Sequence, residues 1–154
     1  MINDKSTTLA TRFRASKGQP VKYENKLVHA MYTRNCILTG AIRIRFKSAT
    51  KAAPQALCVK ARKGALEINK IATRDIAVLW TDTAPNVVDV IYRFKGKGEI
   101  RFWNAWKDSD GVQHAWIGNA GMLVSEQPGH TTLSCSDGIG DPEFRDLIVE
   151  ISDK

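Results

Sequence analysis

Four carboxylate side chains lie within ten positions near the end of the printed sequence: Asp137, Asp141, Glu143 and Asp146. They stand in the segment CSDGIGDPEFRDLIVEI at 135–151. Ca2+ takes about six to eight oxygen ligands and tolerates irregular geometry, so clustered carboxylates and glycine-rich backbone carbonyls can hold it. The segment therefore predicts a calcium site, with Asp137, Asp141 and Asp146 as first ligands and Glu143 as a further candidate.

The same segment also fits a capped turn that needs no ion. Asp137-Gly138 is typical of a tight turn. Asp141-Pro142-Glu143 fits the start of one helical turn, with Asp as N-cap, Pro at the first helical position and Glu near the positive end of the helix dipole. Both interpretations place a final strand at 146–151, and the sequence leaves the choice between them open.

Residues 137–151 resemble the terminal calcium loop of β-sandwich domains found in bacterial surface and secreted proteins. The pattern is D-G-x-G-D-x-D-[FY]-x-D-[LV] before the last strand. Three positions depart from it, Pro142, Glu143 and Arg145, and Arg145 would offset part of the negative charge. The resemblance implies a calcium-stabilised β-sandwich of a kind that usually works outside the cell. The residues in register are Asp137, Gly138, Gly140, Asp141, Phe144, Asp146 and Leu147.

A second candidate site is the hairpin predicted by EIRFWNAWKDSDGVQHAWI at 99–117, with Asp110-Gly111 as its turn. Pairing about this turn sets Lys107 opposite His114 and Ala105 opposite Trp116. Because side chains alternate between the faces of a strand, each set of alternate residues shares one face. The face predicted to enter the core carries Ile100, Phe102, Trp106, Ala115 and Ile117. The opposite face carries Arg101, Trp103, Lys107, His114 and Trp116.

Tryptophan rings beside cationic groups can stack on sugar rings or on unpaired bases. We therefore predict a ligand site for carbohydrate or a surface polymer on the face that carries Trp103 and Trp116. The alternative is that a loop, the N-terminal segment or a second subunit covers this face. In that case the protein is a structural or assembly subunit, and a homo-oligomer is expected.

Basic residues alternate with apolar ones in two predicted strands, AIRIRFK and ALCVKAR. If these strands are neighbours, their cations form one stripe that fits contact with a nucleic-acid backbone; a solvated face is the plainer interpretation. Residues 1–75 carry a net charge of +12 and residues 76–154 a net charge of −5, within a total of +7. This imbalance indicates an acidic partner for the first half, or neutralisation of one half by the other. The cations of the predicted stripe are Arg43, Arg45, Lys47, Lys60 and Arg62.

No catalytic motif is recognisable. The sequence has no G-x-S-x-G segment, its histidines His29, His114 and His130 lie on separate segments, and no H-x-x-x-H spacing occurs. The glycine-rich segments KGKG and DGIGD lack the following helix that a phosphate site requires. A glycosidase stays open, because its two acids are adjacent only in space. The sequence favours a binding protein without enzymatic activity and, apart from calcium, without a cofactor.

Short strands must position these residues. Alternating apolar residues recur between turn signals such as DTAPN, KGKG and GNAG, and no long window shows the helical period. We predict an all-β protein, a single-domain β-sandwich or jelly roll of roughly nine to eleven short strands at 25–154. A flexible basic arm at 1–24 precedes it. No apolar run is long enough for a membrane span or a signal peptide, so we expect a soluble, by default cytoplasmic, protein.

Overall fold

The computed structural model describes residues 7–73 and 75–154. Within these residues it contains one short helix and eleven strands, which confirms the predicted all-β class. The elements are α1 (Leu9–Ala15), β1 (Val21–Tyr23), β2 (Lys26–Val28), β3 (Tyr32–Ala49), β4 (Gln55–Ile68), β5 (Ile71–Thr73), β6 (Ala77–Trp80), β7 (Val87–Lys107), β8 (Gln113–His114), β9 (Gly121–Gln127), β10 (His130–Ser136) and β11 (Leu147–Asp153).

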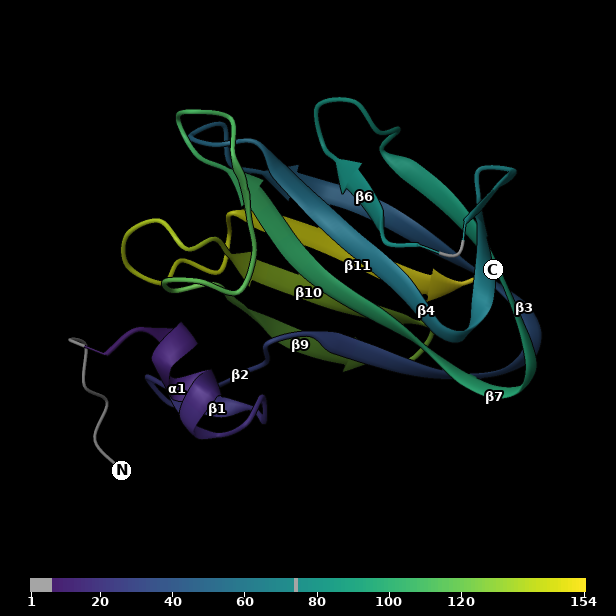
Figure 1. The fold of residues 1–154 in the computed structure, drawn as a ribbon, viewed down its shortest axis with the longest axis horizontal. Coiled ribbons are helices and arrows are strands. Elements are labelled where there is room, and N and C mark those ends of the chain that lie inside the picture. Colours follow the sequence, from purple (N-terminus) through teal and green to yellow (C-terminus); the bar gives the residue numbers. More distant parts are fainter. Residues whose placement is uncertain (1–6, 74) are drawn as a thin grey trace.

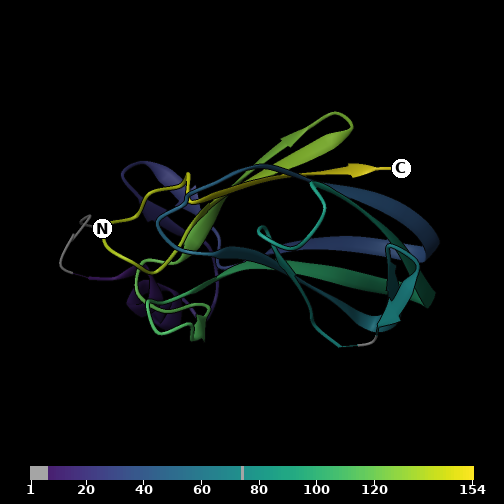
Figure 2. The ribbon, with the colours of Figure 1, turned by 90° about the horizontal axis from the view of Figure 1, so that it is seen from above.

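Nine strands form one antiparallel sheet that folds over itself into a sandwich (Figure 1). Its order is β5-β4-β7-β3-β11-β10-β9, with β6 also paired to β4 and β8 to β7, while β1 and β2 form a separate pair. Figure 2 shows the two layers from the side, with β9, β10 and β11 in one layer and the middle of β4 and β7 in the other. The sandwich-like architecture predicted from the sequence is therefore observed.

The three longest strands, β3, β4 and β7, run through both layers. The pairing of β3 with β7 shifts register between Ile37 and Thr39, and the pairing of β4 with β7 shifts between Arg62 and Gly64. The bulged residues at these shifts, Leu38 and Lys63, have positive φ values of 57° and 69°. A bulge bends its strand and increases the local twist, so the sheet can turn from one layer into the other.

Glycines at this bend make room for one aromatic ring. A Cβ atom placed on Gly64 of β4 or Gly98 of β7 would overlap the ring of Phe94. The segment KGKG, predicted as a turn, is therefore a continuous part of β7. Three of the eleven strands, β3, β4 and β7, are longer than the short strands predicted. The predicted strand AIRIRFK at 41–47 is one part of β3, ALCVKAR at 56–62 is one part of β4, and the first strand of the predicted hairpin, from Glu99, is one part of β7.

The core lies between the two layers and is contributed by both. Ile44 of β3, Phe102 of β7 and Val149 of β11 are fully buried in one apolar cluster. The thiols of Cys36, Cys58 and Cys135 are buried and free. In the described part of the chain no helix is long and apolar enough to span a membrane.

The structure differs from the flexible arm predicted at 1–24, of which residues 1–6 lie outside the described part. Residues 9–15 form α1, whose N-cap Thr8 accepts a hydrogen bond from the Thr11 N–H at 3.2 Å. Leu9 is buried with Val28 and Phe13 in a small second cluster against Gly121 of β9. The helix has only seven residues, which is too short for its apolar side to show as a period in the sequence.

Candidate ligand-binding surface

The hairpin of β7 and β8 forms with a different register from the predicted one. Trp106 pairs with His114 and Lys107 with Gln113, one residue away from the expected pairing of Lys107 with His114. The Asp108 carboxylate causes the shift by closing the loop. Its Oδ1 accepts the N–H groups of Asp110 at 2.9 Å and Val112 at 3.0 Å. Since β8 ends at His114, alternation no longer assigns faces to the residues after it.

His114 therefore leaves the predicted ligand face and supports the hairpin loop instead. Its Nε2 lies 2.7 Å from Asp108 Oδ2, and its ring lies 6.2 Å from that of Trp106. The hydrogen bond to His114, followed by that from the Val112 N–H, lowers the pKa of Asp108. Of the residues assigned to the core face, Ile100, Phe102 and Trp106 are buried, whereas Ile117 is exposed.

Trp103 and Trp116 come together, but only one of them is open to a ligand. Their rings stack with a centroid distance of 4.9 Å and an interplanar angle of 26°. Trp103 is 6% exposed and Trp116 is 44% exposed, so Trp103 forms the floor and Trp116 the outer ring. The prediction that both rings are available is corrected, because Trp116 folds back over Trp103.

Backbone strain accompanies this position of Trp116. Its φ is 58°, in the left-handed region that large side chains rarely adopt. The indole Nε1–H donates to the carbonyl oxygen of Ala30 at 3.0 Å and so fixes the orientation of the ring. Strained residues cluster at functional sites, and such an outlier is a reason to ask what the ring does.

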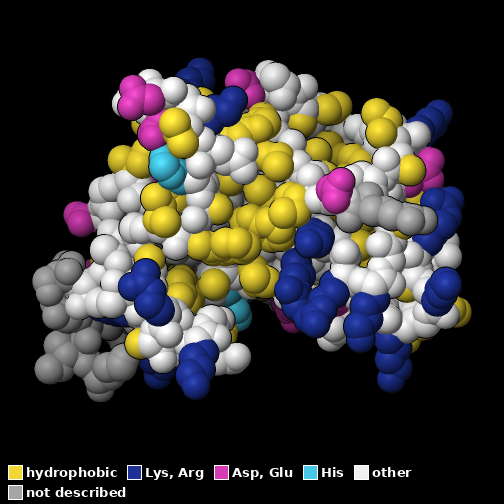
Figure 3. All heavy atoms as spheres, in the orientation of Figure 1, with side chains coloured by type: hydrophobic (Ala, Val, Ile, Leu, Met, Phe, Trp, Pro, Cys, Tyr) yellow, Lys and Arg dark blue, Asp and Glu magenta, His cyan; other side chains and the backbone are white. Residues whose placement is uncertain are grey.

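An apolar surface, here called the Trp116 strip, surrounds this pair on the outer face of β7, β4 and β6. The register places Cys58 opposite both Trp103 and Val78, and places Ala56 opposite both Ala105 and Trp80. Hydrophobic side chains gather over the centre of the face that β4 and β7 present (Figure 3). The accessible part of the strip consists of Met31, Val78, Trp80 and Trp116, which lie over the buried side chains of Ala56, Cys58, Trp103 and Ala105.

Cations border the strip at both ends. At one end, Lys60 of β4 is paired with Arg101 of β7, two positions along the strands from the pair Cys58 and Trp103. At the other end, the Lys107 ammonium lies 4.4 Å from the ring centroid of Trp80. In Figure 3 Lys and Arg side chains lie beside the hydrophobic area on one side. Glu99 holds Arg101 in place through an ion pair of 2.7 Å, which leaves Lys60 as the nearer uncompensated charge.

A cavity of about 350 Å³ continues the strip beyond Met31. Lys17 and Arg101 contribute cations to its wall, and His29 also lines it. Burial lowers the pKa of His29, so this imidazole is neutral at neutral pH. The strip and this cavity together offer an aromatic surface with positive charge at its edge.

The predicted basic stripe does not form, because its two strands are not neighbours. β7 lies between β4 and β3 in the sheet. Arg43 of β3 is paired with Asp89 at 2.8 Å, and Arg62 of β4 lies 3.5 Å from Glu99. Arg45 and Lys47 follow Arg43 on β3, and Lys60 precedes Arg62 on β4, so the five cations stay divided between separate strands.

The acidic segment at 137–146 forms a loop whose carboxylates bind the protein itself. Asp137 is buried and accepts hydrogen bonds from the Ile139 N–H at 3.0 Å and from Gln55 Nε2 at 2.9 Å. Asp146 Oδ2 accepts the Asp137 N–H at 2.9 Å. Asp137 thus forms the predicted tight turn, whereas no helix forms at 141–143.

The four predicted calcium ligands are not assembled into one group. Across residues 7–73 and 75–154, no three His, Cys, Asp or Glu side chains are arranged to hold a metal ion. Asp141 and Glu143 are exposed, while burial and the charges of Asp137 and Glu143 raise the pKa of Asp146 to about 6. Calcium binding stays a prediction, and comparing the melting temperature in calcium chloride with that in EDTA tests it.

Sequence reasoning missed two contributors to the strip, Trp80 and Met31. Trp80 ends β6, and its neighbours across the sheet are set by long-range pairing with β4. Met31 lies just before β3, where the pairing of Tyr32 with Phe102 brings it beside Trp103. No local pattern in the sequence reveals either placement.

The protein defined by these features is an all-β sandwich with an aromatic strip on one outer face. Comparison with known proteins finds no matching family model, no similar curated sequence and no matching solved structure. The functional conclusion below therefore depends on the geometry of this chain.

Proposed function

We propose that this protein is a non-enzymatic binding module that holds an acidic, ring-containing polymer, first of all an acidic polysaccharide, on the Trp116 strip. The single observation that carries the proposal is Trp116 itself. Its ring is held in a strained backbone conformation, hydrogen-bonded to Ala30 and stacked on Trp103, yet nearly half of its surface stays exposed.

Stacking on such a ring suits the flat apolar face of a sugar. A Trp ring supplies a large rigid contact at low cost in side-chain entropy. Trp80 offers a second half-buried ring across the sheet, at roughly 12 Å from Trp103, on which the exposed Trp116 ring stacks, by the usual spacing between strands and between residues. Two platforms at this separation fit successive or alternate units of an extended polymer.

Charge favours an acidic polymer over a neutral one. Lys60, Arg101 and Lys107 border the strip, and Lys17 lies in the adjoining cavity. The whole chain carries a net charge of +7, which raises the local concentration of polyanions and speeds their association. Affinity that depends on these cations falls as ionic strength rises.

The test is a tryptophan fluorescence titration with polygalacturonate, neutral dextran and single-stranded oligo(dT). We expect polygalacturonate to change the emission and to bind more weakly at high salt, and dextran to bind far less. Trp116→Gly should weaken binding of polygalacturonate at least tenfold. Ile71→Ala removes an apolar side chain that is more exposed than Trp116 (72% against 44%) and lies away from the strip, and it should leave binding unchanged.

Unchanged affinity in Trp116→Gly, or equal binding of dextran and polygalacturonate, would contradict the proposal. Preference for oligo(dT) would instead assign the strip to single-stranded nucleic acid, whose bases stack on aromatic rings in the same way.

A second candidate function is assembly through the same strip. The observation that favours it is the apolar character of the accessible part of the strip, where Met31 and Val78 contribute no hydrogen-bonding side chain. Protein interfaces have such apolar centres with polar rims. Sedimentation over a range of protein concentrations tests it: concentration-dependent oligomers that Trp116→Gly dissolves would favour assembly over polymer binding.

A further inference from the structure

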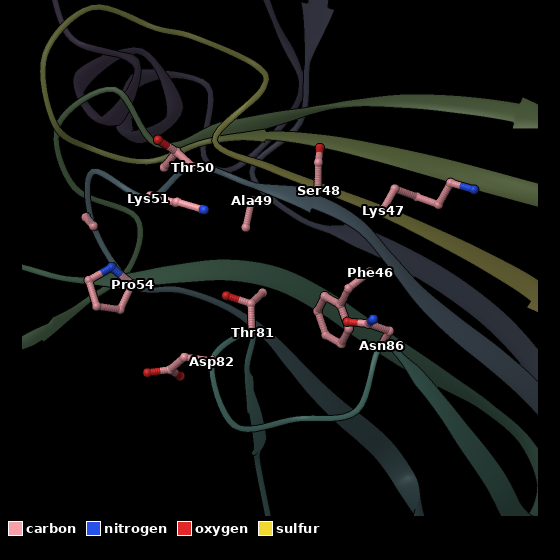
Figure 4. A pocket seen from close by; sticks show the side chains of 11 residues that line it. Phe46, Lys47, Ser48, Ala49, Thr50, Lys51, Pro54, Thr81, Asp82 and Asn86 are labelled. Atoms are coloured by element: carbon pink, nitrogen blue, oxygen red, sulfur yellow. The ribbon is translucent and has the colours of Figure 1, made fainter.

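A cleft at one end of the sandwich shares no residue with the Trp116 strip. Its volume is about 530 Å³, within the usual range of small-molecule sites. Figure 4 shows its two walls. The end of β3 and the residues after it form one wall, and the connection from β6 to β7 forms the other. The side chains that line it belong to residues 46–51, 53, 54, 81, 82 and 86.

Five of the polar side chains that line this cleft have no hydrogen-bond or ion-pair partner in the described structure. Ser48 and Lys51 lie on the first wall, and Thr81, Asp82 and Asn86 on the second (Figure 4). Among the hydrogen bonds and ion pairs of residues 7–73 and 75–154, none uses any of these five side chains. They supply hydroxyl, ammonium, carboxylate and amide groups, so the cleft can both donate and accept hydrogen bonds.

Backbone hydrogen bonds hold the walls in place. The Phe46 N–H donates to Asn86 O at 2.8 Å and ties the two walls together at one end. The Thr50 N–H donates to Asp146 O at 2.8 Å, and the Thr81 N–H to Gln55 O at 3.0 Å. A cleft fixed in this way loses little conformational entropy when a ligand binds.

Apolar surface and charge restrict the chemistry of the ligand. The half-buried Phe46 ring and Pro54 offer flat apolar contacts within the cleft. Lys51 and Asp82 bring one positive and one negative charge, while Lys47 extends away from the other side chains (Figure 4). Because the two charges offset each other, the cleft favours a neutral ligand over an anionic or a cationic one.

We propose that this cleft is a second binding site, for a single neutral polyhydroxylated unit such as a monosaccharide. Each sugar hydroxyl both donates and accepts a hydrogen bond, which matches the mixed groups of the two walls. The C–H face of the sugar packs on Phe46. This site does not depend on the function proposed for the Trp116 strip, because no side chain is common to both.

Two-dimensional 1H–15N NMR with D-glucose, D-galactose and N-acetyl-D-glucosamine tests the site, with D-glucuronate and D-glucosamine as charged comparators. We expect a neutral sugar to shift the backbone signals of residues 46–54 and 81–86 with millimolar affinity. Asp82→Ala should weaken that sugar at least fivefold. Asp110→Ala, which removes an exposed carboxylate in the β7–β8 loop, and Trp116→Gly should not change it.

Both comparators share the ring and hydroxyls of the neutral sugars, so tighter binding of either one, measured from the signals of residues 46–54 and 81–86, would overturn the neutral-ligand proposal. Absence of shifts with all five probes, shifts confined to other residues, or unchanged affinity in Asp82→Ala would overturn the site itself. Because Asp82 is exposed and has no partner in the described structure, the variant is expected to fold, and its unshifted spectrum elsewhere verifies this.

Discussion

Replacement by alanine or by glycine should affect the stability of the protein in opposite order at Trp116 and at Trp103. At position 116 the positive φ of 58° disfavours any residue with a Cβ by about 1–2 kcal/mol. Trp116→Gly should therefore be more stable than Trp116→Ala by about 1 kcal/mol. Trp103 lies within β7, where glycine costs about 0.5–1 kcal/mol relative to alanine. Trp103→Ala should therefore be more stable than Trp103→Gly.

The total costs follow from exposure. Trp116 is 44% exposed, so its removal loses roughly half of the area that a fully buried Trp contributes. That area is about 100 Å², worth about 2.5 kcal/mol, and a ring stack adds about 1 kcal/mol. In Trp116→Gly the relief of backbone strain offsets part of this loss. Trp103→Ala should lose about 3–5 kcal/mol, as buried aromatic residues do.

Urea denaturation of the four variants, followed by circular dichroism, measures these differences. The informative result is which of the two variants, alanine or glycine, is more stable at each position. This comparison does not depend on the absolute free energies of unfolding. If alanine is preferred over glycine at both positions, Trp116 does not occupy the left-handed conformation. The explanation given for its stacking on Trp103 would then be refuted.

Three further outcomes are expected. Gly98→Ala should lower the free energy of unfolding by about 1–3 kcal/mol, because the added Cβ would overlap the Phe94 ring. Gly96→Ala should be nearly neutral, because the space around Gly96 is open. Equal effects of the two variants in thermal melts would contradict the proposed bend. Burial and neighbouring charges raise the pKa of Asp146 from 3.8 to about 6, so its protonated form favours folding and stability should fall as pH rises through this window. Asp146→Asn should remove about 1 kcal/mol of that pH dependence, allowing for solvent screening, and an unchanged pH profile of urea midpoints would argue against it.

The sequence predicts the class of fold because alternation is a local signal. AIRIRFK and ALCVKAR alternate apolar and basic residues, and Ile44 and Val59 are buried as expected. The joining of predicted strands into β3, β4 and β7 could not be predicted in this way. Gly64 and Gly98 look like turn residues in the sequence, and only the position of Phe94 across the sheet shows that they make room for a ring.

The candidate site was predicted in part. Lys107 and Arg101 lie on β7 beside the strip, as their strand positions predict, whereas Trp116 reaches the strip from beyond the end of β8. The hairpin register was not predictable from Asp110-Gly111, since the side chain of Asp108 sets the loop. Burial of Trp103 follows from the turn at Trp116, which breaks the alternation used to assign both rings to the surface.

The structure of the acidic segment at 137–146 could not be predicted from its local sequence either. Its residue types allow both a metal site and a turn, and the distinction depends on a distant residue. Gln55 of β4 donates to Asp137 across the end of the sandwich, a contact between residues 82 positions apart. Its other amide atom, Oε1, is buried without a hydrogen-bond partner in the described structure, so the network around Asp137 is not complete.

The most direct measurement of the central claim is an NMR map of the protein titrated with oligogalacturonate. We expect the indole N–H signal of Trp116 to shift most, together with backbone signals of Met31, Val78 and Lys60. Shifts that leave these residues unchanged and concentrate elsewhere on the molecule would contradict the assignment of the outer aromatic face as the ligand surface.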